Sequence, residues 1–331
     1  MGGNGSTPPS TTFSAPAGSI SPTSFGKIAV DSKQNVWVTT NNGLMEIPAG
    51  TTSCPTFSAC PLLNLSLSPT GIATDSANNI WVTSSINGKV MEINSSCFSF
   101  PSSCPTFTGS PYFSSPTGIA VDSHNNVWVT NDTSSGSVTE ITTTAISNAT
   151  CTSSTCPSFS GLNSFSNPTG IAVDSHNDVW VTNDISSGSV MEILADSTSC
   201  SSSSCKTFSG ISDPVAVTTT GISPWVANRG TNNNYSPGII EITSSSCCPE
   251  ISNFTKPVGL AFDTSGNLWV IDAGNSTTVE ITKPAIDSAS CTAQTPCYQY
   301  SLPAVPVGVV TDSLGNIWIS LASAKVIVYK P

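Results

Sequence analysis

The stretch Gly118-Ile119-Ala120-Val121-Asp122 recurs farther along the chain as Gly170-Ile171-Ala172-Val173-Asp174. In both copies a tryptophan, Trp128 or Trp180, stands six residues after the aspartate. Weaker copies that keep the aspartate are Lys27-Ile28-Ala29-Val30-Asp31, Gly71-Ile72-Ala73-Thr74-Asp75, Gly259-Leu260-Ala261-Phe262-Asp263 and Gly308-Val309-Val310-Thr311-Asp312. A seventh copy, from Val215 to Trp225, has Thr219 in place of the aspartate. The chain is therefore an array of seven repeats.

The tryptophans give the length of each repeat. All seven in the chain occupy this one position, and they are Trp37, Trp81, Trp128, Trp180, Trp225, Trp269 and Trp318. Neighbouring tryptophans are 44 to 52 residues apart, which is the length of a β-propeller blade.

The third repeat shows the strands that each blade is expected to contain. Residues 117–121 form a β-branched first strand, and the turn at residues 122–126 is rich in Asp, Asn and Ser. Residues 127–130 and 137–141 are expected as the second and third strands, and residues 157–160 as the fourth. Such short strands are apolar on both faces, so we expect each sheet to pack between two neighbours, with the tryptophan between blades.

The two ends of the chain predict how the ring closes. The last repeat stops at its third strand, Val326-Ile327-Val328-Tyr329, whereas Thr12-Phe13-Ser14-Ala15 resembles the fourth strands Thr106-Phe107-Thr108-Gly109 and Thr207-Phe208-Ser209-Gly210. An N-terminal strand that completes the last blade would cover its open edge. We therefore predict an all-β fold, a single seven-bladed β-propeller over residues 11–331 that follows a flexible polar tether at residues 1–10.

The pattern Pro-x-Gly-Ile-Ala-Val-Asp, followed by Asn-Val-Trp-Val-Thr and Val-Met-Glu-Ile, resembles NHL repeats over essentially the whole chain. It is similar to the extracellular sensor propellers of bacterial receptor kinases and to the streptogramin (virginiamycin B) lyase family. The lyase resemblance implies metal-assisted ring opening with a histidine base and glutamates on the loop face, often just after the aromatic residue of the second strand. The residues three past each tryptophan include neither type, so this chemistry does not carry over: they are Thr40, Ser84, Asn131, Asn183, Asn228, Asp272 and Leu321.

The twelve cysteines form sequence-local pairs in the connectors between third and fourth strands. These pairs are Cys54/Cys60, Cys97/Cys104, Cys151/Cys156, Cys200/Cys205, Cys247/Cys248 and Cys291/Cys297. Zinc would need four ligands from one neighbourhood, but the pairs lie on different blades without an adjacent histidine. We predict local disulfides and an oxidising compartment. For the adjacent pair, a strained vicinal disulfide that acts as a switch and a degenerate copy of the repeat remain as alternatives.

Composition limits the partners and the location. Only 9% of the residues are charged, the net charge is −11, and Arg229 is the single arginine, so nucleic acid and anionic membrane surfaces are unfavourable partners. No apolar run is long enough for a transmembrane helix. The start of the chain, residues 2–10, resembles the stretch that follows the lipidated cysteine of a bacterial surface lipoprotein. A secreted N-terminus produced by ordinary cleavage is the alternative. Either one predicts an extracellular or cell-surface protein.

Residues that recur once per blade are expected to be structural. The repeat aspartates lie where a carboxylate can accept backbone N–H bonds. The third-strand glutamates also recur, as Glu46, Glu92, Glu140, Glu192, Glu241 and Glu280. His124 and His176 occupy an exposed turn tip that varies among repeats. No catalytic residue, metal site or cofactor is therefore expected.

The repeat varies most in the loops between second and third strands, and these predict the ligand site. Blade five has the longest such loop, residues 228–237. Rigid scaffolds commonly carry function on variable loops. The expected site residues are Asn131, Asp132, Asn183, Asp184, Asn228, Arg229, Tyr235 and Asp272.

The functions that fit are a non-catalytic extracellular module that binds a protein, peptide or carbohydrate, a self-assembling subunit of a surface layer or filament, and a streptogramin lyase-like enzyme. The disulfides and the uncharged Ser/Thr-rich exterior favour the second, and the absence of a catalytic constellation disfavours the third. The binding module is the function that the sequence favours.

Overall fold

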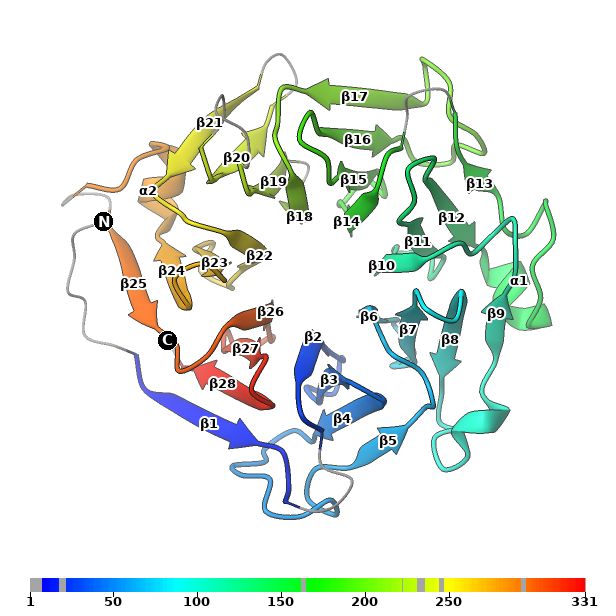
Figure 1. The fold of residues 1–331 in the computed structure, drawn as a ribbon, viewed down its shortest axis with the longest axis horizontal. Coiled ribbons are helices and arrows are strands. Elements are labelled where there is room, and N and C mark those ends of the chain that lie inside the picture. The colour runs from blue at the N-terminus through cyan, green and yellow to red at the C-terminus, as the bar shows by residue number, and fades with distance from the viewer. Residues whose placement is uncertain are drawn as a thin grey trace.

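The computed structural model describes residues 8–17, 22–161, 165–221, 223–230, 236–243, 247–292 and 296–330, and for residues 247–249 it describes the backbone alone. The described residues form seven four-stranded antiparallel sheets arranged as blades around a central channel (Figure 1). Six blades contain four consecutive strands each, and the seventh combines the last three strands with the first one. The predicted all-β propeller is confirmed.

Each blade begins at the channel with an inner strand and continues outward. The inner strands are β2 (Phe25–Val30), β6 (Gly71–Thr74), β10 (Pro116–Val121), β14 (Pro168–Val173), β18 (Pro214–Thr220), β22 (Pro257–Phe262) and β26 (Pro306–Thr311). The second strands, which carry the tryptophans, are β3 (Val36–Thr40), β7 (Ile80–Ser84), β11 (Val127–Asn131), β15 (Val179–Asn183), β19 (Ser223–Asn228), β23 (Leu268–Asp272) and β27 (Ile317–Leu321).

The outer half of each blade is equally regular. The third strands are β4 (Gly43–Ile47), β8 (Lys89–Ile93), β12 (Ser137–Ile141), β16 (Ser189–Ile193), β20 (Gly238–Ile242), β24 (Thr277–Ile281) and β28 (Lys325–Tyr329). The outermost strands are β5 (Leu62–Asn64), β9 (Thr106–Thr108), β13 (Ser158–Phe159), β17 (Cys205–Ser209), β21 (Cys247–Ser252), β25 (Cys297–Ser301) and β1 (Ser10–Ser14).

The repeat aspartate ties the first turn of the blade to the tryptophan. In blade three, one oxygen of Asp122 accepts the backbone N–H groups of His124 and Asn126, each at 2.9 Å. The other oxygen accepts Nδ2 of Asn126 at 3.0 Å and Nε1 of Trp128 at 3.1 Å. The same Asp–Trp bond recurs in blades one, two, four, six and seven. The constant spacing of six residues between Asp and Trp follows from this bond.

Each tryptophan then packs between its own blade and the next, as predicted. Trp37 of blade one lies in one apolar cluster with Ile72 and Val82 of blade two. Outermost strands cover the tryptophans with aromatic rings, as when Phe159 lies 5.3 Å from Trp128 between ring centroids. Full burial of a large apolar side chain contributes about 1.5–3 kcal/mol, so these inter-blade clusters stabilise the contacts between neighbouring blades.

The N-terminal strand closes the ring by pairing with the predicted strand. In the seventh blade β1 pairs with β28, which places Phe13 opposite Val326 and Thr11 opposite Val328. Phe13 is buried, and its ring lies 5.5 Å from that of Trp318. The start of β1 at Ser10 is close to the boundary expected after residue 10, and the described part of the tether is residues 8–10.

Five of the six predicted disulfides are present, and each joins two cysteines between the third and fourth strands of one blade. They join Cys54 to Cys60, Cys97 to Cys104, Cys151 to Cys156, Cys200 to Cys205 and Cys291 to Cys297. The side chains of Cys247 and Cys248 lie outside the described residues, and their pairing stays a prediction. Three connectors also contain short helices, a 3₁₀ turn at Pro101–Ser103, α1 (Thr143–Asn148) and α2 (Lys283–Asp287). Several local disulfides are typical of proteins in an oxidising environment.

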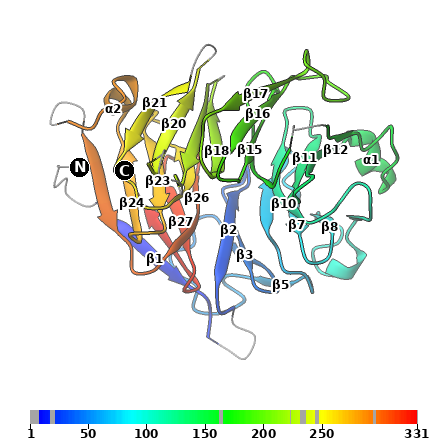
Figure 2. The same cartoon turned by 45° about the horizontal axis from the view of Figure 1, so that its top comes forward.

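The connections leave the ring at two faces, and the strands run between them (Figure 2). The turn face contains the turns between first and second strands together with the Cys-bearing connectors. Asn126 joins the two on this face, because its Oδ1 accepts the N–H of Thr143 at 3.1 Å. The loop face contains the loops between second and third strands together with the connectors that enter each first strand. Among the described residues, no helix is long and apolar enough to cross a membrane.

Candidate functional site

Four of the predicted site residues end a second strand and lie beneath the loop face. Asn131, Asn183, Asn228 and Asp272 are all buried. Oδ1 of Asn131 accepts the N–H of Ser114 at 3.1 Å, and Asp272 accepts the N–H groups of Thr255 and Lys256 at 2.7 and 2.8 Å. Asn131, Asn183 and Asp272 thus hold the incoming connector against the blade, whereas Asn228 bonds Ser236 and Gly230 of its own loop. All four tasks are structural.

The next residue of each blade has a different character. In blades three to seven its backbone N–H bonds the incoming connector, as Asp132 does to Ser115 O at 2.9 Å and Asp184 does to Asn167 O at 3.0 Å. In blade one the Asn41 side chain accepts the N–H of Thr23. The side chain at this position is therefore free to differ among blades. From blade one to blade seven this position holds Asn41, Ser85, Asp132, Asp184, Arg229, Ala273 and Ala322. Charge is thus confined to the adjacent blades three, four and five.

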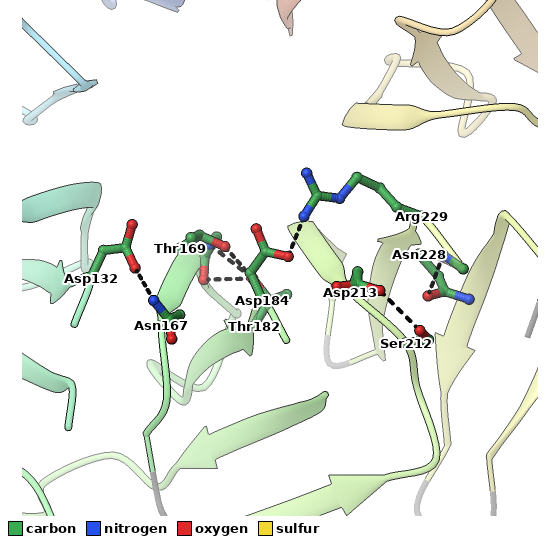
Figure 3. A network of polar contacts seen from close by, with 11 residues as sticks. Asp132, Asn167, Thr169, Thr182, Asp184, Ser212, Asp213, Asn228 and Arg229 are labelled. Carbon is green, nitrogen blue, oxygen red and sulfur yellow. Dashed lines mark hydrogen bonds and ion pairs between the residues drawn. The ribbon is translucent and has the colours of Figure 1, made fainter. Parts of the chain in front are cut away.

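Arg229 and Asp184 form an ion pair across the boundary between blades four and five (Figure 3). The pair joins Nη2 of the guanidinium to Oδ1 of the carboxylate. Both side chains remain partly accessible, with relative exposures of 26% for Arg229 and 18% for Asp184. Nε of Arg229 is buried and has no hydrogen-bond partner among the described residues. One ion pair therefore uses only part of the donor capacity of the guanidinium.

Two further carboxylates flank this pair. On one side Asp132 accepts Nδ2 of Asn167 at 3.1 Å, and on the other Asp213 accepts the Ser212 hydroxyl at 3.0 Å (Figure 3). Burial raises the pKa of Asp184, Arg229 opposes this effect, and the charges of Asp213 and Asp132 add to the increase. The structure thus brings Asp132, Asp184 and Arg229 together with Asp213, which the sequence did not single out.

The charged arc, defined here as Asp132, Asp184, Asp213 and Arg229, contains three carboxylates and one guanidinium. In the sequence Asp213 lies in a connector before a first strand, where nothing distinguishes it from an ordinary turn residue. Asp272 belongs to another blade and does not take part. Tyr235 lies outside the described residues. Binding of a ligand by the remaining residues stays a prediction.

The turn face carries the grouping best suited to a metal. Asp174, His176 and Asp178 each place one ligand atom within 4.8 Å of the others. The sequence predicted no metal site. However, Asp174 already accepts N–H groups from His176, Asp178 and Trp180, and Asp178 accepts the N–H of Ala195. Both carboxylates therefore have structural tasks, although Asp178 uses only one of its acceptor sites in this bond.

The repeated third-strand glutamates have perturbed acidity. Burial is the largest cause of a raised pKa at Glu46, Glu92, Glu140, Glu241 and Glu280. The pKa of Glu140 rises to about 7, with Asp122 and Asp196 adding to the effect of burial. Each glutamate lies opposite the tryptophan of its blade, as Glu140 does opposite Trp128. Since the perturbation recurs around the ring, it reflects the blade rather than one active site.

Comparisons with known proteins show a likeness of fold. No protein-family model matches the chain, and no sequence among the curated proteins is significantly similar to it. Virginiamycin B lyase from Staphylococcus aureus is 18% identical with a TM-score of 0.74, over 98% of this chain and 99% of that one. A streptogramin B lyase is 17% identical with a TM-score of 0.72, over 96% and 97% of the two chains.

A second kind of structural relative is a sensor. The extracellular domain of the hybrid two component system BT4673 from B. thetaiotaomicron is 12% identical with a TM-score of 0.65, over 97% of this chain and 40% of that one. The resemblance to lyase and sensor propellers is thereby confirmed as a likeness of fold. Propellers of one architecture host unrelated activities, so function must be argued from the site.

Proposed function

We propose that this chain is a non-catalytic extracellular binding propeller that holds a polar ligand on the charged arc of the loop face. The observation that supports it is the confinement of charge to one arc of an otherwise neutral ring position, namely Asp132, Asp184 and Arg229. A sevenfold scaffold needs no such confinement for its stability. A binding site requires one, because a ligand occupies one place on the ring.

The charges of the arc indicate the chemistry of the ligand. The arc contains three carboxylates and one guanidinium, so it is acidic even after Arg229 has neutralised Asp184. Such a surface accepts hydrogen bonds from hydroxyl or ammonium groups, and the unused donors of Arg229 add a place for a carbonyl or carboxylate oxygen. A carbohydrate or a peptide with a lysine side chain satisfies both requirements.

The lyase function fits the site less well. The resemblance implies a histidine base on the loop face, but both histidines of the chain, His124 and His176, lie in first turns on the turn face. Positions three past each tryptophan are occupied at blades three to six by buried side chains that bond the connector or, for Asn228, its own loop. These observations support binding without catalysis.

The disulfides fit the extracellular half of the proposal. Five local bonds persist only where the thiols are not reduced, and a secreted or surface-attached protein meets this condition. Attachment through a lipid at the N-terminal tether is one form of this proposal, and free secretion is the other.

Arrays of printed glycans and of lysine-containing hexapeptides test the function. The wild-type protein should bind a subset of one array, and Asp184→Asn or Arg229→Ala should weaken that binding by about tenfold or more, since each loses a charged hydrogen bond. Asn41→Ala, at the equivalent position of blade one, should bind like the wild type. Binding that survives both arc variants, or that the Asn41 variant loses equally, would contradict the proposal.

Isolated rings in electron micrographs distinguish a binding module from a surface-layer subunit, which would form ordered arrays.

A further inference from the structure

The axial channel contains one charged side chain. A cavity of about 300 Å³ lies among the inner strands, and within the part of the chain that the structure describes Lys27 is the only charged residue that lines it. The remaining wall consists of threonine, glycine and apolar residues such as Ile119, Leu260 and Val309. Six inner strands carry no charge at the position of Lys27, where they have Gly71, Gly118, Gly170, Ala216, Gly259 and Gly308. The lysine is therefore a departure from the repeat inside the channel.

Blade one accommodates this lysine because its inner-strand glycine lies one residue earlier than in the other blades. In blade three the sequence is Thr117-Gly118, and a Cβ at Gly118 would lie 2.1 Å from the carbonyl oxygen of Thr169. In blade one the glycine comes first, at Gly26, and a Cβ there would lie 2.5 Å from Oγ1 of Thr39. The bulge that separates Phe25 from Ile28 in the pairing contains both Gly26 and Lys27. Gly26 therefore occupies the closely packed position in blade one, and the side chain of Lys27 lines the channel.

The ammonium group of Lys27 has one hydrogen-bond partner among the described residues. Nζ donates to the carbonyl oxygen of Val307, on the inner strand of blade seven, at 3.3 Å. Among the described residues no carboxylate forms an ion pair with it. An ammonium has three N–H donors, so two are available for another partner. The side chain is accessible to solvent in the channel, although the inner strands that surround it lower its pKa by desolvation.

The Lys27 side chain is exposed to solvent in the channel, so the fold tolerates its charge without a counter-ion. An anion in the channel would nevertheless gain charge-assisted hydrogen bonds from this ammonium. The net charge of the chain is −11, so its long-range field attracts cations and gives no general affinity for anions. A local site is therefore needed to hold an anion, and Lys27 supplies one at the centre of the ring.

We propose that the axial channel binds one small carboxylate anion with a short apolar tail, whose carboxylate pairs with Lys27. The ammonium supplies the two available donors to the carboxylate oxygens. The tail lies against the apolar wall formed by residues such as Ile28, Ile119 and Leu260. The volume is at the lower end of the range for ligand pockets, which excludes an oligosaccharide or a folded peptide. This site is separate from the charged arc and does not depend on the function proposed for it.

Butyrate is a suitable probe, with butyramide as its uncharged counterpart and chloride as a simple anion. Isothermal titration should show one butyrate site in the wild-type protein, and butyrate should raise its Tm while butyramide and chloride at equal concentration do not. Lys27→Met should weaken butyrate binding by about tenfold or more, because the charge-assisted hydrogen bonds are lost. Lys33→Met removes an equal charge from the exposed first turn of blade one and should bind like the wild type.

Several results would overturn the channel site. They are no butyrate binding by the wild-type protein, equal binding of butyramide, or unchanged binding in Lys27→Met. If Lys27→Met does not fold, Lys27→Gly restores the residue of five other blades and serves as the second variant. Loss of butyrate binding in Arg229→Ala but not in the Lys27 variants would place the anion on the charged arc instead. Failure of the glycan and peptide arrays would leave the channel site untouched.

Discussion

The turn face and the loop face are built from the same seven repeats, but their side chains have different partners. On the turn face Asp31, Asp122 and Asp312 all accept the same set of bonds from a turn and a tryptophan. On the loop face the residue after the second strand bonds the incoming connector through its backbone N–H in blades three to seven, and its side chain changes from blade to blade. A side chain with a task in every blade is kept by the fold, whereas one without such a task can be given to a ligand.

Blade five differs from the other blades on both faces. Thr219 stands six residues before Trp225, where the other blades have the repeat aspartate, but in the sheet it lies opposite Pro224 and donates to the carbonyl oxygen of Val173 at 3.2 Å, the same bond that Thr74 makes to Val30. Blade five therefore has no carboxylate to bond the tryptophan. On the loop face of this blade Arg229 supplies the guanidinium of the charged arc. The blade that has lost the standard turn is therefore also the one that contributes the most distinctive side chain.

The largest expected effect tests the difference between the faces directly. Asp122→Ala removes four hydrogen bonds and leaves the buried Nε1 of Trp128 unsatisfied, so the free energy of unfolding should fall by about 3 kcal/mol or more. Asp132→Ala, a few residues away on the loop face, should change it by less than about 0.5 kcal/mol. Urea unfolding of the two variants measures both values. Equal losses would show that the loop-face aspartate is structural too.

The pH dependence of stability should come mainly from the glutamates next to the tryptophans. The pKa of Glu140 rises from an ordinary value near 4.5 to about 7, so the folded chain binds this proton more tightly than the unfolded chain. The free energy of unfolding should therefore be larger near pH 5 and decrease as the pH rises to about 7. Glu140→Gln should reduce the slope of the free energy of unfolding against pH by at most the contribution of about one proton. Thermal unfolding between pH 5 and pH 8 measures this slope.

Asp184→Asn is the matched control on the loop face. Its pKa is also raised by burial, but Arg229 opposes the shift, so the variant should flatten the profile less than Glu140→Gln. A stability that rises between pH 5 and pH 7, or a profile that Glu140→Gln leaves unchanged, would contradict the role given to the glutamates.

The repeat allowed most of the fold to be predicted from the sequence. The spacing of Trp128 and Trp180 gave the blade length, and the likeness of residues 12–15 to other outer strands gave the closure that pairs Phe13 with Val326. The first inference succeeds because six of the blades are local units whose strands follow one another in the chain. The closure joins opposite ends of the chain, and it could be inferred because the last repeat lacks a fourth strand and residues 12–15 resemble one. The Asp–Trp bond was missed, although the constant spacing of six residues was its signal.

The candidate site was predictable only in part, because a site joins residues from different blades. The sequence indicated that the variable loops matter, but it could not separate the buried clamp Asn183 from its accessible neighbour Asp184. Nor could it bring Asp213 beside Arg229, since that contact depends on how two blades pack. Lys27 looked like an imperfect copy of a glycine, and only the ring placed it in the channel.

The smallest expected effect concerns the one aspartate turn in which the standard amide is missing. In five blades an asparagine four residues after the repeat aspartate donates Nδ2 to it, as Asn126 does to Asp122 at 3.0 Å. Blade four has Asp178 there, whose carboxylate keeps the bond to Ala195 N but cannot donate to Asp174. Asp178→Asn should therefore add a hydrogen bond, remove a repulsion between like charges, and raise the free energy of unfolding by about 1 kcal/mol. The reverse change in blade three, Asn126→Asp, should lower it by a similar amount, and urea unfolding measures both. A loss of stability in Asp178→Asn would mean that blade four uses this carboxylate for something that the repeat does not require, and the turn face would then no longer be purely structural.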